Sequence, residues 1–519
     1  MSSAPPGDDL VALVKGGQTN FLGFLLRLAA RLPFLFIAGR IYGADALGRF
    51  AFAVIIVEFA AQLATLGLKR GLAQQLASTD KPHVCVVWDA MLVAFAASAI
   101  GSIILGIFPQ AMFPNSQIHG LEWLLPLIVF AVAGSDVALA ALAYRHNIKA
   151  TVTARALVEP WTLSIAAFFL SFVSSRDGLI IAYVLSMVAA FAASLWPLFK
   201  TYGVPAGWRP EPGALWALAR RNTPLAAADA IEWGSRRVDI ALLGLFFSPA
   251  VVGVYYVAQQ VATLPQKLKT SFDPILSPVI TQKLAEGDRQ AVARQIRQVG
   301  FWIIAAQTGV ALALAIPGEA VMGLMGPKFV GGTGALAFLL AAEVIAATAA
   351  VSEAALIYVA RHRNLVISTL MILVQILLSI GWILSTRALG LRPTVQAVGP
   401  AIALCLSLGL ASILKARLLS HLLGAPVSGW RWALVWAGAG ATLVGYLATL
   451  IPEWGELIIG IPAIMITFGT MIWKRGFTAE DRLLFRRKAP AASGAEAVAI
   501  PVAPPAARPP AASPPPRAE

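Results

Sequence analysis

The residues of this chain that could carry chemistry are charged side chains inside long apolar segments. Arg27 and Arg31 stand four residues apart in the first such segment, and Arg236 and Arg237 are adjacent in the seventh. Ionisable groups at bilayer depth are costly, so they usually face a cavity or a partner. A guanidinium stays charged and binds phosphate oxygens through two parallel hydrogen bonds. These four arginines therefore predict a substrate-binding site for an anionic, phosphate-like group.

Acidic residues share the same segments: Glu58 lies in the second, and Asp229, Glu232 and Asp239 lie in the seventh. On a continuous helix the three acids of the seventh segment fall within about 80° of one another, on the face of Arg236. Two interpretations stay open for these cavity acids. Either they couple transport to a proton or Na⁺, or they pair with nearby arginines and only neutralise them. The arginines of the first segment have the alternative of snorkelling to the membrane surface.

No motif for a metal, a cofactor or a catalytic centre accompanies these charges. The chain has two cysteines, both in apolar runs, and five scattered histidines. This composition excludes a disulfide framework and a zinc site of cysteines and histidines. We therefore expect a protein without metal or cofactor that binds its substrate without transforming it, and not an enzyme.

The chain as a whole is too apolar for a soluble protein. Of its 519 residues, 58% are hydrophobic and 13% are charged, whereas soluble chains carry ~25% charged residues. The remaining class is an all-α polytopic membrane protein, because lipid offers the backbone no hydrogen-bond partners and a helix satisfies its own. Fourteen apolar segments predict about 14 transmembrane helices: 20–41, 49–68, 84–108, 121–144, 153–173, 178–199, 223–247, 250–269, 298–317, 334–360, 364–386, 394–416, 432–451 and 456–473.

The formal charge of +14 is explained by the loops between these segments. With both termini in the cytoplasm, 28 basic residues ahead of the far tail fall on the inner side. Six fall on the outer side, namely Arg40, Arg49, Arg176, Lys328, Arg387 and Arg392. This bias follows the positive-inside rule, so no nucleic-acid partner is needed to explain the charge. On the inner side, 288–297 predicts an interfacial amphipathic helix, and the Pro/Ala-rich chain from about 489 predicts disorder.

A weak internal repeat appears when the chain is shifted by 205 residues. The aligned pairs are Gly39 with Gly244, Gly48 with Gly253, and Arg31 with Arg236. Six segments separate the two units, so they run parallel and predict two six-helix lobes plus two C-terminal helices. The predicted organisation is a cytoplasmic N-terminus (1–19), an N-lobe (20–199), a cytoplasmic linker (200–222), a C-lobe (223–418), two further helices (432–473) and a basic, then disordered tail (474–519).

Two stretches of the repeat resemble a known family. Residues 41–50 (IYGADALGRF), and 237–244 (RVDIALLG) with 252–258 (VGVYYVA), are similar to the openings of the two halves of polysaccharide-unit flippases. This is the Wzx-type, O-antigen and exopolysaccharide branch of the multidrug/oligosaccharidyl-lipid/polysaccharide exporter superfamily. Length, span number and lobes agree with it over about 470 residues. The motifs are degenerate, so they name a family and not a substrate.

The resemblance implies a function in the bacterial inner membrane. It implies a flippase that moves undecaprenyl-pyrophosphate-linked oligosaccharide outward through the lipid bilayer, by alternating access of two lobes, for lipopolysaccharide or exopolysaccharide synthesis. The possible partners include other membrane proteins of polysaccharide assembly. Two alternatives stay open: a cation-coupled drug antiporter of the MATE type, which needs an acidic cavity, and an integral-membrane polymerase or ligase, which needs a larger outer loop.

Overall fold

The computed structural model describes residues 32–118, 120–145, 147–205, 207–266, 288–478 and 481–482. The side chains excepted from this description are those of residues 148, 228, 232, 235, 349, 350, 354, 357, 358 and 361. Every regular element within these residues is helical. By length and composition, nine of the described helices could cross a membrane, and Ala433–Ala448 is a shorter apolar helix. Each predicted segment from the second to the fourteenth contains a helix. The all-α polytopic fold is therefore confirmed.

Several of the predicted segments depart from regular α-helix within the described chain. Gly43 adopts φ 82° and ends the first predicted segment, so residues 32–42 and α2 (Gly43–Ala64) meet at a sharp turn. The fifth segment contains a π-helix (Val152–Val158) before α7 (Glu159–Leu170). Breaks of this kind occur in membrane helices where neighbouring helices satisfy the freed backbone groups.

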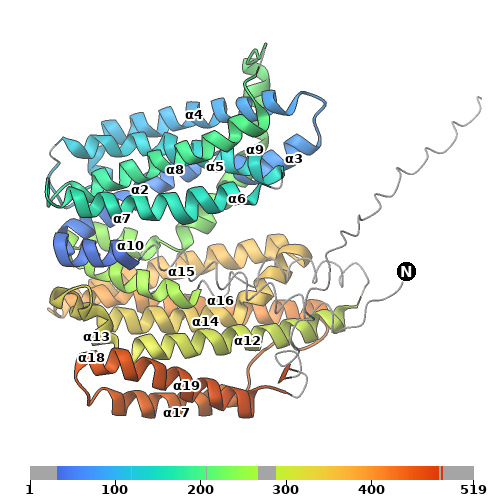
Figure 1. Cartoon of the computed structure of the whole chain (residues 1–519). Coiled ribbons are helices and arrows are strands. Elements are labelled where there is room, and N and C mark those ends of the chain that lie inside the picture. The colour runs from blue at the N-terminus through green and yellow to red at the C-terminus, as the bar shows by residue number, and fades with distance from the viewer. Residues whose placement is uncertain are drawn as a thin grey trace, which may run out of the picture.

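The first group of helices forms one side of the molecule. It comprises α2, α3 (Leu68–Ala77), α4 (His83–Ile107), α5 (Ile128–Tyr144), α7 and α8 (Gly178–Tyr202), which pack on one another. Figure 1 shows them, together with α9 (Pro212–Ser235), above α12, α14, α15 and α16. Many large apolar side chains on this group face outward, such as Ile100 and Phe172, which are 63% and 77% exposed. Such exposure is suited to lipid and not to water.

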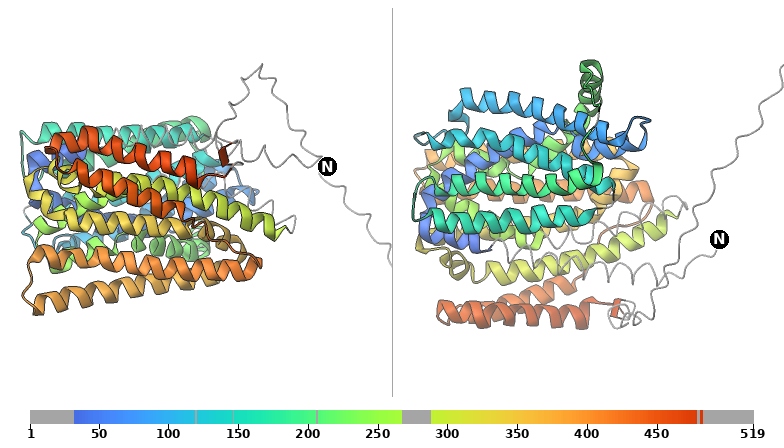
Figure 2. Two further views of the ribbon diagram at one scale, coloured as in Figure 1. Left: turned by 90° about the horizontal axis from the view of Figure 1, so that it is seen from below. Right: turned by 45° about the horizontal axis from the view of Figure 1, so that its top comes forward.

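The second group packs below the first. It comprises α10 (Val238–Phe246), the helix over 249–266, α12 (Arg289–Ala315), α14 (Thr333–Val359), α15 (Arg361–Ala388) and α16 (Pro393–Leu423). The last helices, α17 (Ala433–Ala448) and α19 (Ile461–Met471), pack against α12. In Figures 1 and 2 they lie along the edge of the second group.

The seventh predicted segment is not one helix. It consists of α9 (Pro212–Ser235) and α10, separated by a turn at Arg236 and Arg237. The side chain of Asp239 accepts a hydrogen bond from the backbone N–H of Ile240 at 2.9 Å, at the start of α10. α9 contacts α2, α3 and α4, whereas α10 contacts α2, α15 and α16. The predicted lobe boundary at residue 223 therefore falls inside α9, which packs on the first group.

The predicted interfacial helix at 288–297 is wrong as a separate element. Asp288 caps α12 by accepting a hydrogen bond from the N–H of Ala291 at 2.9 Å, and the helix then continues without a break to Ala315. The helix formed by the basic stretch continues in the same register into the apolar segment that follows it. One helix of 27 residues therefore carries both.

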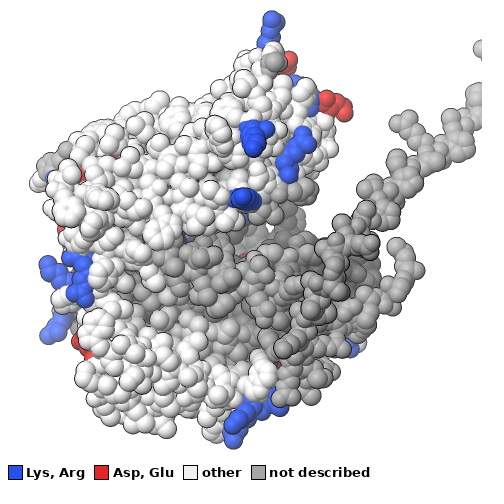
Figure 3. All heavy atoms as spheres, viewed as in Figure 1, with Lys and Arg blue, Asp and Glu red and all other residues white. Residues whose placement is uncertain are grey.

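The connections gather at two ends of the molecule. The end that holds α3, Arg145 and 207–211 is called the basic end, and the end that holds Gly43, 108–118, Phe247 and 324–332 is called the far end. Hydrogen bonds join loops within each end: Arg145 lies 3.4 Å from His83 at the basic end, and Arg40 donates to Leu324 at 2.9 Å at the far end. Charged side chains in Figure 3 lie near the two ends, with an uncharged band between them.

Candidate functional site

A cluster of polar and aromatic residues joins the two groups of helices in the middle of the molecule. This central cluster comprises Glu58 of α2, Tyr183 of α8, Trp233 of α9 and Arg237 of the turn before α10. The Nη1 atom of Arg237 lies 2.5 Å from Oε2 of Glu58, and the hydroxyl of Tyr183 donates to Oε1 of Glu58 at 2.9 Å. The guanidinium of Arg237 lies 4.5 Å from the ring centroid of Trp233.

The turn between α9 and α10 sets the depth of this cluster. Glu58 follows Gly43 by fifteen residues, and Arg237 precedes Phe247 by ten. At 1.5 Å per helical residue, the cluster therefore lies roughly 15–22 Å from the far end, near the middle of a ~30 Å hydrocarbon layer. The side chains of Arg237 and Glu58 are 34% and 25% exposed. Both side chains are therefore partly accessible from outside the protein.

The predicted acids of the seventh segment separate in the structure. Asp229 of α9 lies 2.9 Å from the Nε atom of Arg70 in α3. Asp239 of α10 is fully buried, and its carboxylate accepts hydrogen bonds from Tyr255 at 2.9 Å and Gln259 at 3.0 Å. The expectation of one shared face is wrong because the turn at 236–237 breaks the helical phase. Both described acids bind neighbouring helices.

The remaining predicted residues are placed as follows. Arg27 and Arg31 lie outside the described residues, as does the side chain of Glu232. Arg236 ends α9 with an exposed side chain, and its carbonyl lies 3.5 Å from the Nε2 atom of Gln259. The structure brings two of the predicted site residues, Glu58 and Arg237, into direct contact.

A second charged network lies within the first group and escaped the sequence analysis. Arg155 of the π-helix contacts Asp136 of α5 at 2.5 Å and Glu159 of α7 at 3.0 Å. Lys69 of α3 lies 3.6 Å from the other oxygen of Asp136. Asp136 and Glu159 lie inside apolar segments, which indicates that they have basic partners. Their positions in the sequence do not identify those partners. The network cross-links α3, α5 and α7 on the side of the basic end.

The central cluster can bind an anion and a ring. A guanidinium offers paired N–H donors to phosphate, and an indole offers a flat apolar face to a sugar or an acyl chain. Glu58 competes for the same guanidinium. Among the residues described, no group of three or more histidine, cysteine, aspartate and glutamate side chains is placed to hold a metal ion. The guanidinium and the competing carboxylate therefore suit the reversible binding of an anion.

Comparison with known families places this fold. A family model described as "Polysaccharide biosynthesis protein" matches residues 37–323, which is more than half of the chain. The chain belongs to this family. Among curated proteins, none matches the chain.

Solved structures show the fold of this member of the polysaccharide biosynthesis protein family. The lipid II flippase MurJ in an inward closed conformation is similar with a TM-score of 0.70 at 11% identity, over 88% of this chain and 99% of that one. An inward-facing MATE family multidrug transporter is similar with a TM-score of 0.60 at 15% identity, over 77% of this chain and 98% of that one. A MOP superfamily transporter from Pyrococcus furiosus is similar with a TM-score of 0.54 at 14% identity, over 82% of this chain and 99% of that one. The fold is that of MOP superfamily transporters.

Proposed function

We propose that this protein is a flippase for undecaprenyl-pyrophosphate-linked oligosaccharide units in a bacterial inner membrane. Three observations support the proposal: the family, the flippase-type fold, and an arginine at mid-bilayer depth between the two groups of helices. The single observation that carries it is Arg237, which stands at the break between α9 and α10 and lies over Trp233. A guanidinium beside an indole suits a diphosphate that bears a sugar.

The proposed cycle is alternating access between the two groups of helices. The diphosphate approaches from the basic end, which we assign to the cytoplasm by the positive-inside rule. It displaces Glu58 from Arg237 and binds the guanidinium through two hydrogen bonds. The groups then rock, and Glu58 recovers Arg237 as the anion leaves.

The membrane potential can drive this cycle. An inside-negative potential favours outward movement of negative charge by ~2.3 kcal/mol per charge per 100 mV. Arg27, Arg31 and Arg236 are proposed as further contacts of the anion. Asp229, Glu232 and Asp239 stay candidates for proton or Na⁺ coupling, although the described contacts of Asp229 and Asp239 give each a structural task.

The test is headgroup translocation in proteoliposomes that hold the undecaprenyl-pyrophosphate oligosaccharide. Arg237→Ala is expected to lower the initial rate at least tenfold, because one charged, bidentate hydrogen-bonded contact is worth about 1.5–3 kcal/mol. Arg363→Ala removes an exposed arginine near the start of α15 and is the matched control, which keeps the wild-type rate.

Two results would contradict the proposal. Translocation that is equal in Arg237→Ala and wild type would reject the assignment of Arg237. An absence of translocation in wild type, together with proton-driven efflux of a cationic dye, would make the protein a drug antiporter of the MATE type.

A further inference from the structure

Two glycines of the internal repeat meet at the far end. A Cβ atom on Gly48 of α2 would lie 1.7 Å from the carbonyl oxygen of Pro249, and one on Gly253 would lie 2.0 Å from the carbonyl oxygen of Ala44. Both obstacles are backbone atoms, which cannot rotate away as a side chain can. α2 and the helix over 249–266 therefore cross in direct backbone contact, which only glycine at both positions permits. Such crossings through small residues are a common way for membrane helices to pack.

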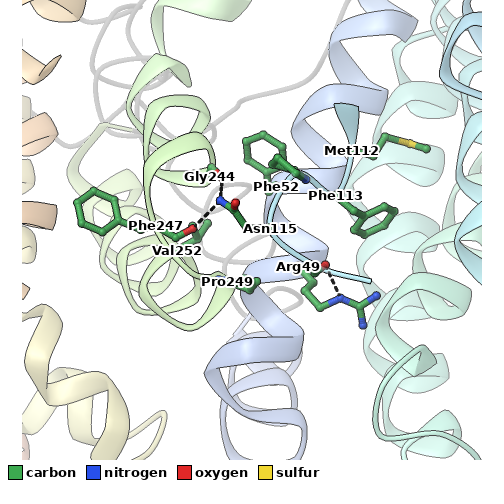
Figure 4. Close-up of a pocket in the computed structure, with 12 residues that line it drawn as sticks. Arg49, Phe52, Met112, Phe113, Asn115, Gly244, Phe247, Pro249 and Val252 are labelled. Carbon is green, nitrogen blue, oxygen red and sulfur yellow. Dashed lines mark hydrogen bonds between the residues drawn. The ribbon is translucent and has the colours of Figure 1, made fainter. Parts of the chain in front are cut away.

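A loop of the first group reaches across this crossing. The Nδ2 atom of Asn115 donates to the carbonyls of Gly244 at 2.8 Å and Phe247 at 3.0 Å, at the end of α10. Figure 4 shows Asn115 pointing at these two carbonyls across a pocket that Arg49 and Val252 also line. The last carbonyls of a helix lack intrahelical partners, so Asn115 serves as the cap of a helix in the other group.

The loop that carries Asn115 is anchored to the first group by Arg49. Arg49 donates to Ser116 at 3.0 Å and to the carbonyl of Gln117 at 3.2 Å, and it contacts Glu122 at 2.5 Å. Arg49 is 6% exposed and Glu122 is 1% exposed, so this anchor is firm. When the groups separate, the loop stays with the first group and loses the two bonds of Asn115, and Arg40 loses its bonds to the carbonyls of Leu324 and Gly323.

We propose that the Gly48–Gly253 crossing is the seam that closes the far end of this transporter, and that Asn115 is the latch that holds the seam shut. The inference needs the transporter fold and no particular substrate. Water can replace the latch bonds on the carbonyls of α10, so releasing the latch costs the net value of two hydrogen bonds rather than their full strength. A weak latch beside a tight crossing gives two discrete states, closed and open, as alternating access requires.

The experiment measures exposure of the seam in purified, substrate-free protein. Cys85 and Cys405 are replaced by serine, and Val252→Cys introduces a reporter at a pocket position that is 1% exposed. The rate of labelling by a water-soluble maleimide reports opening. Asn115→Ala is expected to raise this rate roughly tenfold, the effect of two ordinary hydrogen bonds. Gln110→Ala is the matched control, because it alters an exposed side chain of the same loop outside the latch and its anchor, and it leaves the rate unchanged.

Alanine at the crossing is the second arm. Gly48→Ala and Gly253→Ala are each expected to raise labelling at least as much as Asn115→Ala, because the added methyl group forces the helices apart. Gly438→Ala is the control, since a Cβ there meets nothing within 4 Å. Wild-type labelling in Asn115→Ala would overturn the latch, and wild-type labelling in folded Gly48→Ala would overturn the seam. If the glycine variants do not fold, Asn115→Ala alone decides.

Discussion

Arg237 and Glu58 neutralise each other in the middle of the bilayer, and this pairing limits what either can do. Arg237 cannot bind a substrate anion through the same N–H groups that hold Glu58. We therefore expect Glu58→Gln to tighten the binding of inorganic pyrophosphate about three- to fivefold, since a partly exposed ion pair is worth up to about 1 kcal/mol. Isothermal titration of purified protein measures the Kd.

The opposite sign of two variants makes this prediction specific. Arg237→Ala should weaken pyrophosphate binding, whereas Glu58→Gln should strengthen it. Tyr183→Phe keeps the carboxylate and removes one hydrogen bond to it, so it serves as the control with a Kd close to wild type. Weaker binding in Glu58→Gln would show that Glu58 supports the anion site and does not compete for it.

Asp136 contributes to stability through Arg155 and Lys69. Asp136→Asn leaves Arg155 with Glu159 alone and removes a charge from a carboxylate that is 8% exposed. We expect the free energy of unfolding to fall by about 2 kcal/mol. Removing one partner of an isolated buried ion pair costs about 3–5 kcal/mol, and the loss here is smaller because Arg155 keeps one partner. Thermal unfolding in detergent checks it, with the exposed Asp80→Asn as control. Equal Tm values for the two variants would contradict the structural role.

At the scale of elements, Asp481 ties the chain after the last membrane helix to α12. Its buried carboxylate accepts hydrogen bonds from Gln298 at 2.7 Å, Trp302 at 3.1 Å and Arg431 at 3.1 Å, and from the N–H of Thr478 at 2.9 Å. Burial alone would raise the pKa of Asp481, but these hydrogen bonds, that from Gln298 first, outweigh burial and lower it. The stabilisation is therefore present above the carboxyl's ordinary pKa and is lost as the pH falls through its lowered value.

This contact predicts protection of the chain around Arg482. At neutral pH, Asp481→Ala should speed tryptic cleavage after Arg482 at least fivefold, because the segment loses its attachment to α12. Glu453→Ala, an exposed acid at the other end of the same helix pair, should leave cleavage unchanged. Cleavage that is already fast in wild type would show that the carboxylate does not hold this segment.

The whole molecule has two ends of unequal charge, and this asymmetry predicts its orientation. We expect a membrane-impermeant maleimide to label Gln110→Cys at the far end in intact cells, and to leave Arg209→Cys at the basic end unlabelled until the membrane is opened. Both side chains are exposed, so access to water is equal in the isolated protein. Labelling with the opposite pattern would invert the proposed direction of transport. The native Cys85 and Cys405 are replaced in both variants.

The amino-acid sequence by itself determined the membrane fold and its family. Insertion of a segment depends on the summed apolar character of ~20 neighbouring residues, which is a local quantity. The second to the fourteenth predicted segments therefore coincide with helices. The 205-residue repeat also aligned Gly48 with Gly253 before any contact between them was known.

Only the tertiary structure decided how the charges are used. Glu58 and Arg237 are 179 residues apart, and Asn115 reaches a carbonyl 129 residues away. Local periodicity carries no information on such partners. The turn at 236–237 also separates acids that a continuous helix would align, and it brings α9 to the first group of helices. Ion pairs and helix breaks are settled by packing between distant segments, and packing exists only in the folded molecule.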